Sequence, residues 1–412
     1  MATKKLFTLD RYLKECDSEI IEIIDMDSPN QMDLILDRTV FFPTGGGQNC
    51  DTGKIGTFDV VDVFEKDNTI HHIIDTSNSD NLPKKSDTLR CRLNWERRFL
   101  NMQRHCGEHI LSGIIDSEFG GVNRGFHMGK DYMTIDISLE KNPKINFLNL
   151  PMLKHAEILA NEVVWNNLPV TVRHFKTKKE AEDLPLRKPL TIEHDISIVC
   201  VGNTENPSDC VACCGTHPNT AGAVGLIKIY KVEPNKGMFR IYFDAGKNAF
   251  ENYANIHDTI SELCKKYSAK KDNLIEKLQI LEEKNKLVKN ELFHTKNTII
   301  DIVSKELTNK YKATRNGFPI IAYNSTLTLG KSDIENLSKK LTAPKNALFI
   351  IYDTETLELY LISDGNIDCT SFKSDMETYG AKGGGNKNFA TFKFQSAKNL
   401  KQTLEFLYKH KI

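Results

Sequence analysis

The chain has 412 residues, of which 40% are hydrophobic, 27% charged and 8% aromatic. This composition is typical of a folded soluble protein of roughly two to four domains, and it excludes a collagenous or largely disordered chain. The 55 Lys and Arg residues balance 55 Asp and Glu residues, so the zero net charge by itself argues against a general binder of polyanions.

Residues 1–90 predict a β-rich domain. Short segments rich in β-branched and aromatic residues, such as 39–42, 58–64 and 69–74, are separated by turn signals. A run of three glycines interrupts them at 45–47. Strands that are this short and closely spaced indicate a small barrel or sandwich, and we expect a β-barrel-like domain.

A mixed α+β segment follows over residues 91–246. From Trp95 to Gly113 the apolar residues recur at mostly helical spacing, which predicts a helix. The other elements that we predict here are strands at 132–137, 197–201 and 238–243 and a helix at 152–165.

The next segment, residues 247–296, predicts a long helix or helical hairpin. Residues 247–294 contain no proline and no internal glycine, and their apolar positions recur mostly every three or four residues. A polar gap falls at Lys270 and Lys271. The helix is either half of a hairpin or coiled coil, or it docks on its own domain.

Residues 297–412 alternate between strand and helix patterns, which predicts a separate α/β domain. We expect strands at 318–323, 347–352 and 357–362 and helices at 334–341 and from about residue 397. Taken together, the segments predict an α+β protein.

Ten cysteines are too few for a disulfide scaffold in a chain of this length. No apolar run approaches the ~18 residues that a membrane-spanning helix needs. The first residues also lack the apolar segment of a signal peptide. We therefore expect a cytoplasmic protein with no membrane partner, in which the clustered Cys210, Cys213 and Cys214 indicate metal binding or catalysis.

Two pairs of residues predict a metal site. His105 and His109 are four residues apart in the predicted helix, so their imidazoles share one face. Cys213 and His217 are also four apart, and Gly215 lets the backbone turn between them. Three imidazoles and one thiolate form a tetrahedral donor set that suits Zn²⁺.

Residues 105–109 also match the inverted zinc-protease signature His-x-x-Glu-His, in which Glu108 would be the general base. That signature needs a downstream Glu ligand and has no place for a Cys-x-x-x-His pair, so a zinc protease is the less favoured alternative. Cys210 and Cys214 are spare sulfurs that we do not expect to bind the metal.

The glycine run is the other unusual segment. Gly45, Gly46 and Gly47 would let the backbone approach a ligand closely, and Gln48 could offer its amide to a polar group. On local grounds alone, a hairpin turn with polar decoration is the better interpretation.

Three motifs occur in order: the Gly-Gly-Gln loop, His-x-x-x-His and Cys-x-Gly-Thr-His. In this the chain resembles the alanyl-tRNA editing proteins of the long AlaX type, and the editing and C-terminal parts of alanyl-tRNA synthetase. The resemblance covers nearly the whole chain and includes the glycines at 383–385, which resemble the glycine motif of the DHH-associated RNA-binding domain. It implies that the zinc ligands are His105, His109, Cys213 and His217.

The resemblance implies a trans-editing hydrolase that deacylates alanine tRNA mischarged with serine, with glycine as a secondary substrate. A pocket for alanine excludes serine poorly, and a second hydrolytic site corrects the error. Nothing in the chain resembles the aminoacylation core, so we expect removal of amino acids from tRNA and no attachment.

Zinc would either activate a water, with Glu108 as general base, or anchor the substrate, with Thr44, Gln48 and Glu108 shaping the pocket. Glu108 replaces a Thr that is usual in the synthetase, and His127 replaces a pocket Gln. The residues expected to bind the substrate are Gly45, Gly46, Gly47, His127 and Thr216.

The division of charge locates the expected tRNA contacts. Residues 295–412 carry 17 Lys and Arg against 12 Asp and Glu, whereas residues 1–246 carry 29 against 35. The basic tail can meet phosphates, although a solvated lysine-rich face is the alternative. The candidate contacts are Lys382, Gly383, Gly384, Gly385 and Lys387, together with Arg97 and Arg98, which could equally be structural.

Two further expectations remain open. A homodimer could form through the 247–296 helix or the C-terminal domain. A function of a different class is a zinc-stabilised RNA-binding module without catalysis. An open pocket that joins the zinc site to the glycine loop would favour the enzyme, and a fully packed ion would favour the module.

Overall fold

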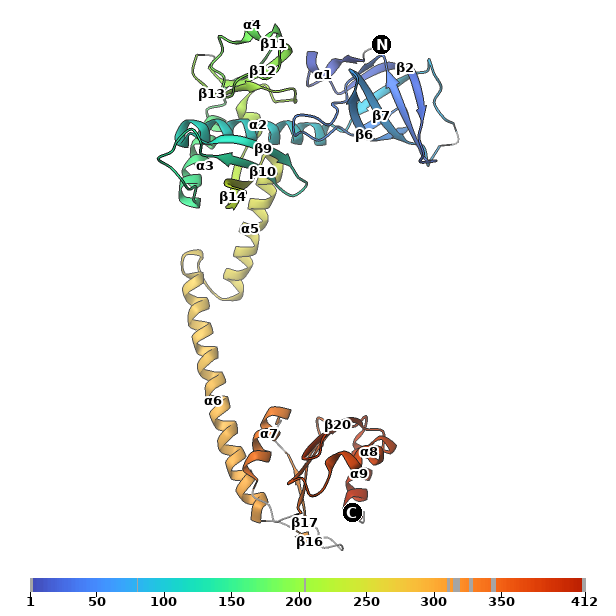
Figure 1. Ribbon diagram of the computed structural model, residues 1–412, viewed down its shortest axis with the longest axis vertical. Coiled ribbons are helices and arrows are strands. Elements are labelled where there is room, and N and C mark those ends of the chain that lie inside the picture. The colour runs from blue at the N-terminus through green and yellow to red at the C-terminus, as the bar shows by residue number, and fades with distance from the viewer. Residues whose placement is uncertain are drawn as a thin grey trace. The chain divides into compact units, whose positions relative to one another are not determined.

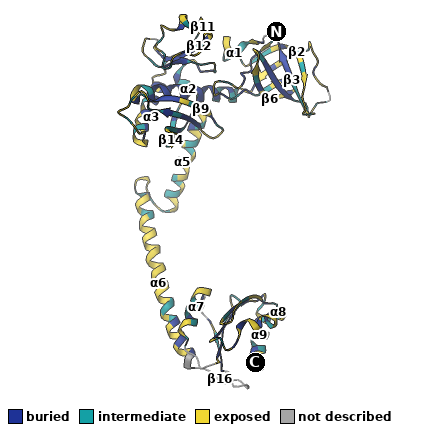
Figure 2. Ribbon diagram, in the orientation of Figure 1, coloured by how far each residue is buried: buried dark blue, intermediate teal, exposed yellow. Residues whose placement is uncertain are grey.

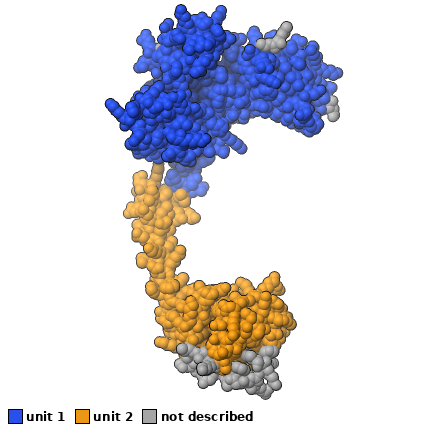
Figure 3. Space-filling model, viewed as in Figure 1, with its two compact units in different colours: residues 1–262 blue, residues 263–412 orange. Residues whose placement is uncertain are grey.

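The computed structural model describes residues 3–79, 81–203, 205–309, 312–313, 319–325, 329–341 and 346–409. The chain divides into two compact units, residues 1–262 and 263–412 (Figure 3). Both units combine helices with sheets, which confirms the predicted α+β class. The finer division into four segments stays a prediction, and the boundary between the two units falls inside the predicted helical spacer.

The first unit begins with a closed six-stranded barrel (Figure 1). Its strands, in the order in which they pair, are β2 (Glu15–Asp25), β3 (Gln31–Leu36), β7 (Thr69–Asp75), β6 (Phe58–Lys66), β5 (Gly53–Ile55) and β8 (Thr88–Leu93). Inward-facing side chains such as Ile20, Leu34 and Val63 are fully buried, because alternate residues of each strand face the interior. Beside the barrel, β1 (Lys4–Lys5) pairs in parallel with β4 (Arg38–Thr39), and α1 (Leu6–Leu9) follows β1.

The rest of the first unit is built around α2 (Trp95–Phe119). The Asn94 side chain caps its N-terminus by accepting the Arg97 N–H, and Gly120 ends it in the left-handed conformation. Most of the middle of α2 is buried (Figure 2). It forms one hydrophobic core with α3 (Leu150–Trp165) and two sheets.

These two sheets are antiparallel. The four-stranded sheet has the order β14 (Ile227–Asn235), β15 (Met238–Ala245), β10 (Met133–Ser138) and β9 (Val122–Met128). The three-stranded sheet consists of β11 (Val170–Thr177), β12 (His194–Gly202) and β13 (Pro207–Ala212), with α4 (Lys178–Ala181) after β11 and the 3-10 helix η1 (Ala221–Val224) after β13.

Two glycines let α2 approach both sheets closely. A Cβ on Gly113 would lie 2.0 Å from the Ser208 carbonyl oxygen of β13, and one on Gly107 would lie 2.4 Å from the Ala245 Cβ of β15. Side chains at either position would push the helix away from the strands. The two glycines therefore help to fix α2 next to the end of β13, where the Cys-x-Gly-Thr-His motif begins.

A buried ion pair joins the barrel side of the unit to α2. Arg98 Nε lies 3.0 Å from both Asp51 carboxylate oxygens, and its Nη2 donates to the Val40 carbonyl at 2.6 Å. Both side chains have no exposed surface. Removing either partner would leave the other charge buried without compensation, so the pair holds the glycine-loop region against the helix.

The segment that was predicted as a long helix or helical hairpin is divided into two helices. The structure has two helices, α5 (Gly246–Lys266) and α6 (Leu274–Asn309), with the 3-10 turn η2 (Lys271–Asn273) between them. The break coincides with the polar gap at Lys270 and Lys271, and Ser268 there has a φ of 48°. Without apolar residues to bury and with a left-handed residue, the helix cannot continue through this point.

The second unit contains a six-stranded mixed sheet with hydrophobic clusters that draw on both faces of its strands. The strand order is β16 (Lys312–Ala313), β17 (Pro319–Asn324), β18 (Leu348–Asp353), β19 (Glu358–Ser363), β21 (Phe389–Lys393) and β20 (Lys382–Asn386). After η2 and α6, the helices of this unit are α7 (Lys331–Lys340), η3 (Cys369–Phe372), α8 (Lys373–Thr378) and α9 (Ala397–Lys409). The predicted strand 318–323 corresponds to β17, and its first residue, Phe318, lies outside the described residues.

No helix in the described part of the chain has the length and hydrophobicity needed to cross a membrane.

Candidate metal centre

Four side chains that the sequence predicts as metal ligands converge in the first unit. His105 and His109 project from α2, while Cys213 and His217 come from the segment after β13. Their ligand atoms all lie within 4.8 Å of one another, and none of the four is exposed. The packing of α2 against β13 thus brings together two pairs that are about a hundred residues apart in the chain.

The distances within this cluster fit a tetrahedral ion. Cys213 Sγ lies 3.4 Å from His105 Nε2 and 3.7 Å from His217 Nε2. Tetrahedral Zn²⁺ with bonds of about 2.0–2.3 Å has edges of roughly 3.3–3.8 Å between its ligands. His109 Nε2 is buried and has no hydrogen-bond partner among the described residues, as expected of an atom reserved for a metal.

Gln48 holds one histidine of the cluster. Its Oε1 accepts the His105 Nδ1–H and the Thr216 N–H, both at 3.0 Å, and its Nε2 donates to Thr216 Oγ1 at 2.9 Å. These bonds leave the His105 Nε2 free to face the metal. Gln48 is buried, and these bonds engage its carbonyl oxygen and one of its two N–H groups, so it supports the cluster; its role with a substrate stays a prediction.

A second support was not predicted from the sequence. Asp209 Oδ2 accepts the His109 Nδ1–H at 2.8 Å, and the same carboxylate is paired with Arg187. A carboxylate that accepts the outer N–H of a metal-binding histidine fixes its tautomer and orientation. The one signal in the sequence was a charged residue inside the strand β13, where Asp is uncommon.

Electrostatics favour the thiolate form of the cysteine. Burial alone would raise the pKa of Cys213, but the imidazoles of His105, His217 and His109 lower it well below its ordinary value. Burial would also lower the pKa of His109, yet the Cys213 thiolate and the Asp209 carboxylate raise it to about 10. A divalent cation would replace the proton between these groups, because thiolate and neutral imidazole are its preferred ligand forms.

The glycine run forms a tight hairpin turn beside this cluster. Gly45 and Gln48 exchange two backbone hydrogen bonds, and Gly46 and Gly47 between them have φ values of 59° and 81°. A Cβ on Gly47 would lie 2.4 Å from the Phe126 ring, whose face stacks on His105 at 5.6 Å between centroids. The glycine run therefore forms the hairpin turn that local rules predicted. The turn places Gln48 next to His105 in the candidate metal centre.

Three further residues that the sequence predicted for the substrate pocket, Glu108, Thr44 and His127, differ in how far they are buried. Glu108 is buried, and its Oε1 accepts from Ser112 Oγ at 2.6 Å and Asn123 Nδ2 at 2.7 Å. Thr44 is exposed, and its Oγ1 accepts the Cys50 N–H. His127 is exposed on β9, where its neighbour Phe126 faces the cluster. Their roles with a substrate stay predictions.

The four converging groups include no carboxylate. A zinc protease of the His-x-x-Glu-His type needs a Glu as third ligand, and here Cys213 and His217 complete the set. Cys210 and Cys214 lie outside the group, as expected. Cys210 is joined in a disulfide to Cys200 of the neighbouring strand, although the sequence favoured metal binding or catalysis over disulfides for the clustered cysteines.

The structure corrects one predicted tRNA contact. Arg98 has no exposed surface, and its guanidinium is taken up by Asp51 and backbone carbonyls, so it has the structural role that the sequence left open. Arg97 is half-buried and donates to the Cys50 carbonyl at 3.0 Å. Lys382 and Lys387 are exposed at β20, the edge strand that contains Gly383, Gly384 and Gly385.

Several curated proteins are similar to this chain, although no family model matches it. The alanyl-tRNA editing protein AlaX-L of Pyrococcus horikoshii is 32% identical over 60% of this chain and 59% of its own length. The alanine–tRNA ligase of Pyrobaculum calidifontis is 27% identical over 94% of this chain. The chain therefore spans only 59% of that AlaX-L and 42% of that ligase.

A third relative is matched over nearly all of its length. The alanyl-tRNA editing protein AlaX-M of Methanosarcina barkeri is 31% identical over 58% of this chain and 98% of its own length. Given this match and the four converging ligand side chains, the chain belongs to the family of alanyl-tRNA editing proteins.

Proposed function

We propose that the protein is a zinc-dependent aminoacyl-tRNA deacylase that hydrolyses the ester between serine and the terminal ribose of alanine tRNA, with glycine as a secondary substrate. The observation that carries the proposal is the convergence of His105, His109, Cys213 and His217 beside the Gly45–Gln48 hairpin turn. The AlaX-L and AlaX-M relatives, which are named alanyl-tRNA editing proteins, support aminoacyl-tRNA as the substrate class.

The residues of the cluster would hold Zn²⁺, which as a Lewis acid can anchor or polarise the ester. The chain's own side chains prepare this site. Gln48 and Asp209 fix the rings of His105 and His109, and Phe126 closes one side of His105. Glu108, held by Ser112 and Asn123, is the carboxylate next to the ligands that we propose as acceptor of a proton from water.

Exposed residues beside the candidate metal centre support an enzyme over a purely structural zinc module. Gly46 and Cys214 are both exposed, and a Cβ on Gly46 would lie 3.1 Å from Cys214 Sγ. The residues between the ligands Cys213 and His217 also line a cavity of about 570 Å³. A substrate can therefore come close to the ligand-bearing segment.

The test compares release of amino acid from alanine tRNA charged with serine, glycine or alanine. We expect fastest release of serine, and we expect Cys213→Ser to abolish zinc binding and hydrolysis together. Cys264→Ser, which changes a free cysteine on α5, is the matched control and should leave both intact. A metal-free Cys213→Ser protein with full deacylase activity would show that the proposal is wrong.

A further inference from the structure

A cavity of about 570 Å³ lies in the first unit beside the metal centre. One wall is the N-terminal segment 5–12, which includes α1, and the floor includes residues of β11 and β12 such as His174 and Ser197. In Figure 1, α1 lies between the barrel and this sheet. Residues 214–216, the three residues between the proposed ligands Cys213 and His217, also line the cavity.

Arg11, which lines this cavity, is held firmly in position. Its Nε and Nη2 donate to Asn219 Oδ1 at 3.1 and 2.9 Å, and its carbonyl oxygen accepts from Arg98 Nη1 at 3.0 Å. The Asn219 N–H in turn donates to the Tyr12 hydroxyl at 3.2 Å. Asn219 is two residues beyond His217, so Arg11 is tied to the segment that carries the metal ligands.

The charge of Arg11 has no anionic partner in the described part of the chain. No carboxylate there lies within ion-pair distance of it, and the neighbouring Asp10 accepts the Tyr12 N–H instead. Burial lowers the pKa of the Arg11 guanidinium, and the nearby Tyr12, Cys106 and Asp10 offset this only in part, which reflects the cost of holding the cation in this environment. A bound anion would relieve that cost, and phosphate is one of the two anionic groups, with carboxylate, that a guanidinium binds through paired charge-assisted hydrogen bonds.

The other residues that line the cavity indicate which further groups the ligand carries. Lys5 is already paired with Glu65, so Arg11 is the lining cation that is free for an anion. His174 and Asp195 on the floor are exposed and offer a ring nitrogen and a carboxylate to hydroxyl or amino groups. A nucleotide, with one phosphate and several such groups, has this chemistry, and cavities of about 300–1,000 Å³ suit ligands of its size.

We propose that this cavity binds the 3′-terminal nucleotide of the RNA substrate, with Arg11 contacting its phosphate. The proposal rests on the proposed function, because the aminoacyl ester is attached to that nucleotide and must reach the metal. Residues 214–216 would then contact the terminal ribose while Cys213 and His217 bind the metal on the same segment.

The experiment measures hydrolysis of two substrates by wild type and Arg11→Gln. One substrate is seryl alanine tRNA, and the other is seryl-adenosine, which bears the same ester but no phosphate. We expect Arg11→Gln to raise KM for the tRNA by about 10- to 100-fold and to leave seryl-adenosine hydrolysis unchanged. Arg38→Gln, which changes an exposed arginine paired with Asp37 on the barrel side, should leave both substrates unaffected.

Equal losses with both substrates in Arg11→Gln, or no loss with either, would overturn the proposal. A second variant, His174→Glu, replaces a ring that faces the hydroxyl or amino groups of the nucleoside and, unlike Arg11→Gln, should raise KM for both substrates. If wild type hydrolyses neither ester, the proposed function fails. Binding of a trinucleotide ending in adenosine, weakened by Arg11→Gln and not by Arg38→Gln, would then still support the cavity, and equal binding by both variants would refute it.

Discussion

Two of the three cluster histidines are held at Nδ1 by partners that come from distant parts of the chain. His105 donates to Gln48 of the hairpin turn, and His109 donates to Asp209 of β13. Each bond sets the tautomer in which Nε2 would be available to a metal ion. At the scale of single residues, the centre is therefore defined as much by these two acceptors as by the four ligands.

Asp209→Asn should weaken zinc binding by about 10- to 100-fold, because the neutral amide supports the His109 ring less strongly than a carboxylate. The measurement is competition with a chromophoric chelator at fixed pH, with circular dichroism to confirm the fold. Asp116→Asn, which removes an ion pair with Lys141 elsewhere on α2, is the control. Equal zinc affinity in both variants would mean that Asp209 serves only Arg187.

Gly47→Ala should lower deacylation by about 100-fold, because its Cβ would lie 2.4 Å from the Phe126 ring that stacks on His105. Gly237→Ala is a matched control, since Gly237 has a φ of 80° against 81° for Gly47 and nothing within 4 Å of its Cβ. Both variants should lose similar stability from backbone strain. Equal activities of the two would contradict a specific role for Gly47.

At the scale of elements, a buried ion pair links the barrel side of the first unit to α2. The Arg98–Asp51 pair joins α2 to the segment after the glycine turn, and the glycines of α2 let it pack on β13 and β15.

The barrel also encloses His72. Its Nδ1–H donates to the Leu34 carbonyl, and its Nε2 lies 2.8 Å from Thr39 Oγ1. The imidazole of His72 is therefore neutral in the barrel interior.

Barrel stability should depend on pH through this histidine. Burial lowers the pKa of His72 from 6.5 to about 4, so between these values the unfolded chain binds more protons than the folded one. The unfolding free energy should therefore fall as the pH drops from 6.5 towards 4, by about 2–3 kcal/mol at pH 4.5. Urea denaturation of wild type and His72→Gln at pH 7 and 4.5 tests this.

The comparison between the two proteins isolates the histidine, because the acid sensitivity of the metal centre is common to both. His72→Gln should lose stability at pH 7 and show a smaller further loss at pH 4.5. An identical pH dependence in the two proteins would mean that other groups govern acid unfolding of the barrel.

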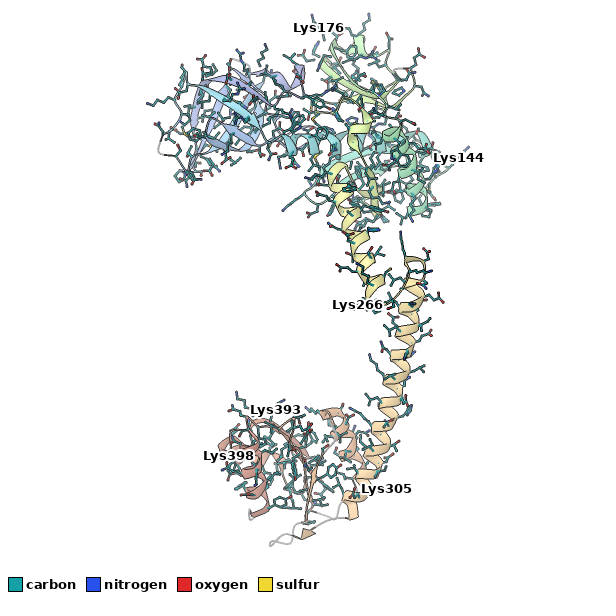
Figure 4. The ribbon with its side chains drawn as sticks, turned by 180° about the vertical axis from the view of Figure 1, so that it is seen from behind. Lys144, Lys176, Lys266, Lys305, Lys393 and Lys398 are labelled. Atoms are coloured by element: carbon teal, nitrogen blue, oxygen red, sulfur yellow. A yellow bond between two sulfur atoms is a disulfide. The ribbon has the colours of Figure 1, made fainter. Side chains whose placement is uncertain are left out.

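At the scale of the whole molecule, the candidate metal centre and the candidate tRNA contacts at β20 belong to separate compact units, while the candidate contact Arg97 belongs to the first. The centre belongs to residues 1–262, and the exposed glycine strand β20 belongs to residues 263–412. Lysines such as Lys393 and Lys398 extend from the second unit (Figure 4). The zero net charge of the chain conceals an acidic first part and a basic tail, and a homodimer through the latter or through the helices stays a prediction.

The double variant Lys382→Gln and Lys387→Gln should weaken binding of alanine tRNA and lower its salt dependence by about one to two units, because each lysine that neutralises a phosphate contributes about one unit. Fluorescence anisotropy across a salt series measures this. Lys373→Gln, in which an exposed lysine four residues from Glu377 is changed, is the control. An unchanged salt slope would place the RNA-binding surface elsewhere, while hydrolysis of seryl-adenosine should be unaffected in either case.

The amino-acid sequence by itself predicted the α+β class, many of the longer elements and the four side chains that converge in the candidate metal centre. The four residues were predictable because a spacing of four is a local property of a helix or a turn. Imidazole and thiolate are also known zinc ligands whatever the fold. The hairpin turn at the glycine run was likewise readable from local rules.

Only the tertiary structure decided what surrounds those ligands. Asp209 lies a hundred residues from His109, and Arg11 lies more than two hundred from Asn219, so no local pattern could pair them. Burial turned Arg98 from a candidate RNA contact into half of an ion pair, and the left-handed residue in the polar gap divided the predicted long helix in two. These outcomes depend on long-range packing and on which charges lose their water, and those are properties of the folded chain.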